Sequence, residues 1–196
     1  MDLHVIDAID QHAFDLGASD AAMLCEKLRD TPINIVPHVA RNTQELRGVI
    51  SAIIAYRSSY CDPRKAIPYV HISCHGSQDE LLIGTVDHMP WRSLSDILLP
   101  LQEKTDYNVP LSISACEGFY GWKLAWGIDK KYRKRRPYYS LVGPTNKEAI
   151  GPLCDAFAQF YRRLLMNYQK LKSALEQANR SGGVKLSYTY GSEIVY

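Results

Sequence analysis

The sequence has almost no excess of charge of either sign and no long apolar run. Its 23 Lys and Arg residues and 21 Asp and Glu residues leave a formal net charge of +2, too small to indicate binding to nucleic acid or to an acidic membrane surface. No stretch approaches the ~18 consecutive apolar residues that a membrane-spanning helix needs. Residues 1–10 have no apolar core of the kind found in signal peptides, so we expect a cytoplasmic protein.

Cysteine is scarce, and its distribution excludes a disulfide framework. The count is odd and no two cysteines are closely spaced, which is typical of free thiols in a reducing compartment. The five are Cys25, Cys61, Cys74, Cys116 and Cys154. Most cysteines in such a chain are small core residues, so a cysteine with a chemical function has to be identified by its neighbours in the sequence.

What the chain does contain is apolar runs that alternate with amphipathic segments. Strands are predicted over residues 3–9, 33–39, 68–73, 110–115, 138–143 and 184–190, with a small hairpin over 81–88. Helices are predicted over residues 18–29, 42–60, 91–101 and 152–179. Strands separated by helices imply parallel pairing, so we predict one α/β domain over residues 1–196, a three-layer α/β/α sandwich with a mostly parallel central sheet.

Two of the predicted strands end in residues that can carry out chemistry. One apolar run leads into Cys74-His75-Gly76, and another leads into Cys116-Glu117-Gly118. Ligands of α/β sheets bind at the carboxyl ends of the strands, where neighbouring strands would place His75 beside Cys116. A thiol is mostly protonated near neutral pH, and a neighbouring imidazolium favours the thiolate. We therefore predict Cys116 as a nucleophile and His75 as its acid/base partner.

The glycine after the histidine fits the same chemistry. Gly76 has no side chain, so a substrate carbonyl can approach its backbone closely. The N–H groups of Gly76 and Cys116 are then predicted to bind the oxyanion of a tetrahedral intermediate. Thiolate–imidazole chemistry needs no metal ion, and we expect no cofactor.

These two motifs together resemble the caspase-like cysteine peptidases. The segment Ser114-Ala115-Cys116-Glu117-Gly118 is similar to the caspase signature Q-A-C-[RQG]-G, whose histidine lies about 50 residues upstream; the separation here is 116 − 75 = 41. Within that group the chain most resembles the CHAT branch, which often has a histidine four residues before the catalytic one, as His71 is here. It also tends to end in a helix like residues 157–178. The likeness covers about residues 68–178.

The resemblance implies a cysteine endopeptidase with the caspase-like fold, cutting specific protein substrates under the control of a regulatory partner. It also implies a role as an effector in bacterial immunity or cell death. Ser114 and Glu117 replace the glutamine and the usual arginine of the signature, near the primary specificity pocket. We predict that Ser114, Glu117 and the nearby Asp79 contact the substrate. The alternative is a catalytically silent caspase-like domain that docks a protein partner.

Two further patterns are open to more than one interpretation. His71, Cys74, His75 and Cys116 are residue types that bind zinc, but alternation along a strand would put Cys74 on the face opposite to the histidines, so we expect no metal site. Residues 129–137 form a basic segment whose simplest interpretation is a solvated loop. The alternatives are a self-processing site or a surface that steers an acidic partner.

Overall fold

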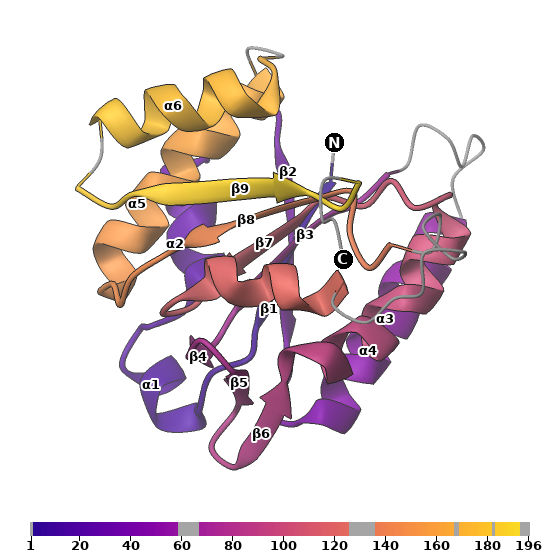
Figure 1. The fold of residues 1–196 in the computed structure, drawn as a ribbon. Helices are drawn as coiled ribbons and strands as arrows, with labels where there is room; N and C mark the ends of the chain where they lie inside the picture. Colours follow the sequence, from indigo (N-terminus) through magenta and orange to yellow (C-terminus); the bar gives the residue numbers. More distant parts are fainter. Residues whose placement is uncertain (1, 59–66, 126–135, 167–168, 182, 193–196) are drawn as a thin grey trace.

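A mostly parallel six-stranded sheet forms the centre of the computed structural model, which describes residues 2–58, 67–125, 136–166, 169–181 and 183–192. In spatial order its strands are β2 (Asn34–Val39), β1 (Asp2–Asp7), β3 (Tyr69–Ser73), β7 (Leu111–Ser114), β8 (Ser140–Pro144) and β9 (Leu186–Tyr190) (Figure 1). The first five strands are parallel, and β9 pairs antiparallel with β8. The predicted strand segments are therefore confirmed, with small shifts at their ends.

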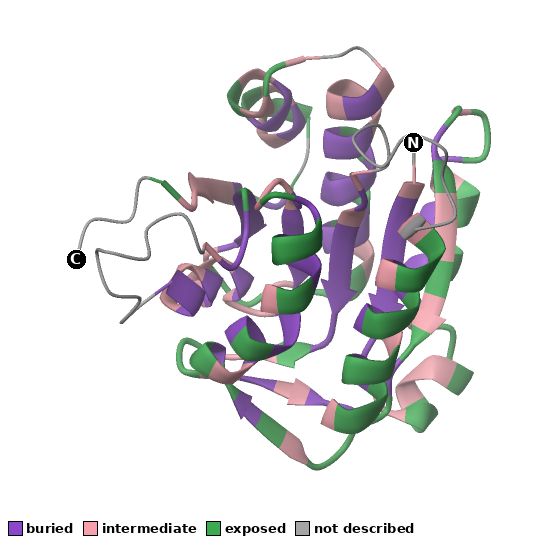
Figure 2. Cartoon of the chain, turned by 90° about the vertical axis from the view of Figure 1, so that its right-hand side faces the viewer, coloured by how far each residue is buried: buried purple, intermediate pink, exposed green. Residues whose placement is uncertain are grey.

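Helices cover both faces of this sheet. One face carries α2 (Asp20–Lys27), α5 (Ile150–Tyr161) and α6 (Leu171–Ser181), and the other carries α3 (Thr43–Ser58) and α4 (Trp91–Lys104) (Figure 1). Strand side chains alternate between two apolar cores: Leu3 and Val5 pack with α2 and α5, whereas Ile6 and Ile72 pack with α3 and α4. Figure 2 shows the inner strands of the sheet buried between these layers, whereas the edge strand β2 is intermediate or exposed, and this arrangement confirms the predicted three-layer α/β/α class.

Helix α3 begins where the sequence predicts it. The side-chain oxygen of Asn42 accepts a hydrogen bond from the Glu45 N–H at 2.8 Å, and the Glu45 carboxylate accepts one from the Arg41 N–H at 2.8 Å. The first turn of a helix has N–H groups without intrahelical partners, and such bonds satisfy them. Within the described residues, none of the helices combines the length and the apolar character that crossing a bilayer requires.

Several short elements gather at the carboxyl edge of the sheet. They are helix α1 (Gln11–Asp15), the antiparallel strands β4 (His75–Gly76), β5 (Glu80–Ile83) and β6 (Asp87–Pro90), and the 3-10 helix η1 (Gly118–Ala125). The predicted hairpin corresponds to β5 and β6. Helix α1 and η1 were not predicted, because one or two turns contain too few residues for a helical period to stand out.

The predicted continuous helix over residues 152–179 is wrong. Helix α5 ends at Tyr161, a π-helical turn follows over Arg162–Met166, and α6 starts a new direction at Leu171 (Figure 1). A straight helix of 28 residues would be about 42 Å long, whereas a five-residue strand spans only about 17 Å. The break lets Ala174, Leu175 and Ala178 of α6 join the same apolar core as α5 rather than extend past the sheet.

A buried polar cluster joins the sheet to the helices on the α5 face. His71 on β3 is fully buried, with Nε2 3.1 Å from the Asp20 carboxylate of α2 and Nδ1 2.9 Å from the Tyr161 hydroxyl of α5. Asp7 at the end of β1 accepts a hydrogen bond from the Ser19 hydroxyl at 2.6 Å. Burial raises the pKa of Asp7, and the negative charge of Asp20 adds to that increase. The cluster therefore ties β1, β3, α2 and α5 together.

Removing the His71 imidazole should destabilise the fold strongly. His71→Leu leaves the Asp20 carboxylate buried without its partner, which should lower the free energy of unfolding by about 3–5 kcal/mol. The measurement is urea denaturation. The matched control is His88→Leu, because His88 also contacts a carboxylate, Glu80, at 2.6 Å, but at an exposed site. That change should stay within about 0.5 kcal/mol. Equal effects of the two changes would contradict the assigned role of His71.

Candidate active site

A cavity of about 270 Å³ opens at the carboxyl edge of the sheet, and both His75 and Cys116 line it. Strands β1, β3 and β7 bring their ends to this edge, because Asp7 pairs with Ser73 and Ser73 pairs with Ser114 in the parallel register. The lining residues are Ile9, Ala13, Ala18, Ser73, Cys74, His75, Ser114, Ala115, Cys116, Glu148, Ile150 and Leu153. The structure thus brings the two predicted catalytic residues to one site.

Cys116 occupies a sharp turn between β7 and η1. The next residue, Glu117, has a φ of 57°, a left-handed conformation that residues other than glycine adopt rarely. Gly118 completes the turn, where a Cβ would lie 2.5 Å from the Ile113 carbonyl oxygen. The Cys116 thiol is partly buried and donates a hydrogen bond to the Glu148 carbonyl oxygen at 3.8 Å. A backbone conformation of this kind holds the thiol at the mouth of the cavity.

His75 extends from β4 with an exposed side chain, and its nearest charged neighbour is Asp10. The imidazole Nε2 lies 3.8 Å from the Asp10 carboxylate. Asp10 also caps α1, where its carboxylate accepts a hydrogen bond from the Ala13 N–H at 2.8 Å. That bond, and to a smaller extent the charge of His75, lowers the pKa of Asp10. Within the described residues no hydrogen bond joins His75 to Cys116.

The sequence did not identify Asp10 as a site residue. The available signal was its position: Asp10 directly follows the apolar run 3–9, as Cys116 directly follows the run 110–115 and His75 follows the run 68–73 after one residue. Its contact with His75 also depends on α1, which places the Asp10 carboxylate between the helix end and the imidazole.

Gly76 brings the two strand ends into direct contact. A Cβ at this position would lie 2.9 Å from the Cys116 carbonyl oxygen and 3.0 Å from the Ala115 Cβ, so only glycine fits without a shift. Gly76 lies opposite Leu81 in the antiparallel ladder, and the neighbouring residues Ser77 and Glu80 form a hydrogen-bonded pair, in which the Ser77 N–H donates to the Glu80 carbonyl oxygen at 2.9 Å. Pairs alternate in antiparallel ladders, so Gly76 is in a non-hydrogen-bonded pair and its N–H points away from β5.

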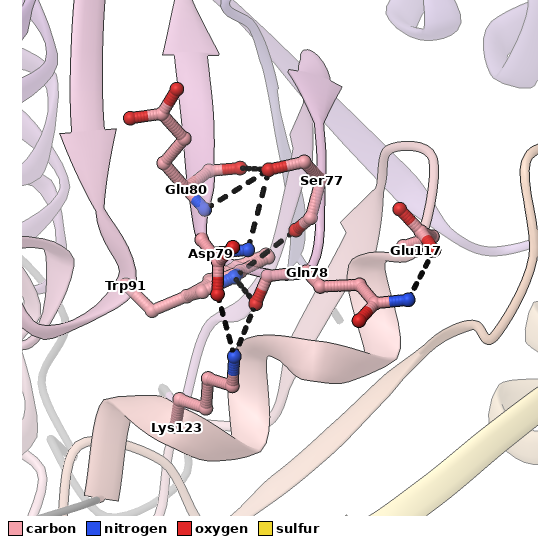
Figure 3. Close-up of polar contacts among 7 residues, drawn as sticks. All are labelled: Ser77, Gln78, Asp79, Glu80, Trp91, Glu117 and Lys123. Carbon is pink, nitrogen blue, oxygen red and sulfur yellow. Dashed lines mark hydrogen bonds and ion pairs between the residues drawn. The ribbon is translucent and has the colours of Figure 1, made fainter.

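The turn that follows Gly76 is fastened to the segment that follows Cys116, as Figure 3 shows. The Gln78 side-chain amide donates to the Glu117 carboxylate at 2.9 Å. The Lys123 ammonium of η1 donates to the Gln78 carbonyl at 2.7 Å and to the Asp79 carboxylate at 3.1 Å. These contacts hold the loop that carries His75 against the helix that follows Cys116.

The three predicted substrate contacts lie in different surroundings. Ser114 lines the cavity, and its hydroxyl is buried without a hydrogen-bond partner in the described part of the chain. Asp79 and Glu117 are not among the described lining residues, and they contact Lys123 and Gln78 instead. A role for either in substrate binding stays a prediction.

The other cysteines differ from Cys116 in burial. Burial raises the pKa of the Cys74 thiol well above its ordinary value and raises that of Cys154 to about 12. No cluster of three or more metal-ligating side chains occurs within the described ranges. His71 instead contacts Asp20 and Tyr161, as described above. Cys61 and most of the basic segment 129–137 lie outside the described residues.

Neither a scan against protein-family models nor a search of the curated proteins gave a match to this chain. The resemblance to caspase-like peptidases therefore stays a prediction from the two motifs, and the functional argument depends on the geometry of the site.

Adding a methyl group at Gly76 should disturb the site. In Gly76→Ala the new Cβ meets backbone and Cβ atoms that cannot move independently, so the free energy of unfolding should decrease by about 1–3 kcal/mol. The control is Gly48→Ala in α3, where nothing lies within 4 Å of the new Cβ. That change should increase stability by about 0.5–1 kcal/mol, because alanine favours a helix. Denaturant unfolding measures both, and a neutral Gly76→Ala would refute the close contact.

Proposed function

We propose that this chain is a cysteine endopeptidase that cleaves peptide bonds in specific protein substrates through Cys116 and His75. The observation that carries the proposal is that both side chains line one cavity at the carboxyl edge of the sheet. The contact between Gly76 and the Cys116 backbone supports it, because it brings together the backbone of the two catalytic segments. The strained turn at Glu117 is a second support, since strain of this kind clusters at functional sites.

The reaction that this site supports has two stages. The Cys116 thiol gives its proton to His75, the sulfur adds to the peptide carbonyl carbon, and the N–H groups of Gly76 and Cys116 bind the oxyanion. The carbon–nitrogen bond then breaks as His75 protonates the leaving amine, which leaves a thioester on Cys116. Water gives a proton to His75 and adds to the thioester. Collapse of that adduct releases the carboxylic acid, and the proton returns to the thiol.

Two features of the free site define what must change during this reaction. The thiol donates to the Glu148 carbonyl oxygen, so it has to rotate toward His75 before it transfers its proton. Asp10 lies 3.8 Å from His75, beyond ordinary hydrogen-bond distance. At that distance its carboxylate stabilises the imidazolium that forms, and we assign Asp10 as a positioning residue.

The separation of the thiol from His75 also favours a second candidate function. Each reactive side chain has a different partner in the free structure, Glu148 for the thiol and Asp10 for the imidazole. A catalytically silent domain that docks a protein partner would have no need of a contact between the two. An electrophilic peptide mimic separates the candidates, because only a peptidase site should direct it to Cys116.

Loss of either catalytic side chain should abolish cleavage. Cys116→Ala and His75→Ala should each lower kcat/KM by more than about a thousandfold, because the thiol and the imidazole act as a unit. The double variant should lose little more than either single variant. The measurement is mass spectrometry of the products from a peptide library, followed by kinetics on the best peptide. Cys25→Ala, which removes an exposed thiol, is the control and should keep full activity. If the loss of kcat/KM in the double variant equalled the product of the two single losses, Cys116 and His75 would not act as a pair.

Replacing the Asp10 carboxylate should reduce turnover without preventing substrate binding. Asp10→Asn keeps an oxygen that can cap α1 but removes the charge beside His75, so kcat should decrease about tenfold or more while KM changes little. The pH profile of kcat should also move, which a merely structural defect would not cause. Asp10→Glu should restore part of the rate. An unshifted profile in Asp10→Asn would contradict the positioning role.

A further inference from the structure

We propose that the cavity beside Cys116 binds one uncharged side chain that ends in a carboxamide, that of glutamine or asparagine, from the residue whose carbonyl is attacked. This inference rests on the proposed peptidase function and specifies its substrate class. It follows from the size of the cavity, the charges around it and one buried hydroxyl.

The cavity is large enough to hold a whole amino-acid side chain. Its volume of about 270 Å³ equals that of about nine liquid water molecules at ~30 Å³ each. Pockets for drug-sized ligands are larger, at about 300–1,000 Å³. Cys116 is itself part of the lining, so the side chain closest to the reacting carbonyl is the one that enters.

The walls are mainly apolar and come from segments that lie far apart in the sequence. Six of the lining residues are aliphatic, and they contact the stem of any side chain that enters. They are Ile9, Ala13, Ala18, Ala115, Ile150 and Leu153. The stem of glutamine or asparagine suits such walls.

The charges around the cavity disfavour an acidic side chain. Among the described lining residues there is no lysine or arginine, and Glu148 carries the only carboxylate. An aspartate or glutamate would therefore have to be buried near a like charge, and the only lining group that could pair with it as a cation is the exposed imidazole of His75. The N-terminus of α5 would attract an anion, but Glu148 lies directly before that helix and offsets this attraction.

The interior of the cavity also disfavours a basic side chain. Glu148 is partly exposed, so it can meet a cation only where solvent is also available. Ser73 and Ser114, the buried polar side chains on the strand ends, are neutral. A lysine or arginine that filled the cavity would bring its charge among apolar groups and hydroxyls, where its loss of hydration is poorly compensated.

Ser114 indicates that the group at the end of the side chain is polar. This residue is only 4% exposed, and its hydroxyl has no hydrogen-bond partner within the described residues. Buried hydroxyl groups are normally hydrogen-bonded, and a ligand atom would satisfy this one. A carboxamide has an oxygen that accepts from the Ser114 hydroxyl and an N–H that donates to the Glu148 carboxylate or to Ser73. Neither an aliphatic side chain nor a carboxylate offers both an acceptor oxygen and an N–H donor.

The test uses peptidyl acyloxymethyl ketones that differ only in the side chain next to the reactive ketone. The Cys116 sulfur displaces the acyloxy group as a carboxylate and forms a thioether, so intact mass measures the rate of labelling. The series contains glutamine, asparagine, leucine, glutamate and lysine. Labelling should be fastest with one of the two carboxamide probes. Its rate should exceed that of the leucine probe at least about tenfold, and it should exceed the rates of the glutamate and lysine probes by a larger factor.

Ser114→Ala measures the contribution of the hydroxyl. The preference for the carboxamide over leucine should decrease about tenfold in this variant, because one hydrogen bond is lost. The variant should fold, since no hydrogen-bond partner of the hydroxyl occurs among the residues that the structure describes. Its unfolding midpoint should be equal to or above that of the natural chain. Ser112→Ala on the same strand face is the control. Ser112 hydrogen-bonds to Tyr161, so its loss should lower stability and leave the preference unchanged.

The outcomes separate this inference from the function on which it rests. Fastest labelling by glutamate, lysine or leucine overturns the inference alone, as does a preference that persists in Ser114→Ala. Failure of all five probes to label Cys116, or equal labelling of His75→Ala, overturns the peptidase function and the inference with it. Carboxamide-selective labelling that depends on both His75 and Ser114 supports both.

Discussion

The buried imidazole of His71 holds together the elements on which the cavity depends. It contacts Asp20 on α2 and Tyr161 on α5, so it joins one strand to two helices at once. Residues at the ends of the adjoining segments, Ala18 before α2 and Leu153 in α5, form cavity walls. A polar contact that is fully buried favours one arrangement over its alternatives, because any displacement leaves a buried polar group without its partner. His71 therefore helps to fix the relative positions of β3, α2 and α5, the elements next to these cavity walls.

The exposed half of the site is held in a different way. His75 lies on a short strand outside the main sheet, and its loop is attached to η1 through Lys123 and Gln78. These contacts are more accessible to water than the His71 cluster, so each stabilises the structure less. The proposed nucleophile, Cys116, thus follows a strand of the main sheet, and its proposed acid/base partner, His75, lies on a separate small sheet.

The sequence was informative where apolar runs end. The inner strands β1, β3, β7 and β8 are buried on both faces, so their boundaries are clear in the sequence, and His75 and Cys116 follow two of them. Asp10 could not be assigned in the same way, because its contact depends on a one-turn helix that has no period to detect. The contact of Lys123 with Asp79 depends on η1, which was also missed. The break after Tyr161 was missed because the length of the sheet limits how long the helix can be. A local sequence pattern carries no information about that length.

The spread of the cavity residues along the chain has a consequence for biosynthesis. The lining begins at Ile9 and ends at Leu153, a separation of 153 − 9 = 144 positions. A ribosome adds about 5–20 residues per second, so roughly 7–30 seconds pass between the synthesis of the first wall residue and the last. Until Leu153 has emerged and α5 has docked, Cys116 lacks one side of its enclosure. The nascent chain therefore cannot complete the cavity around Cys116 until most of the chain has been made.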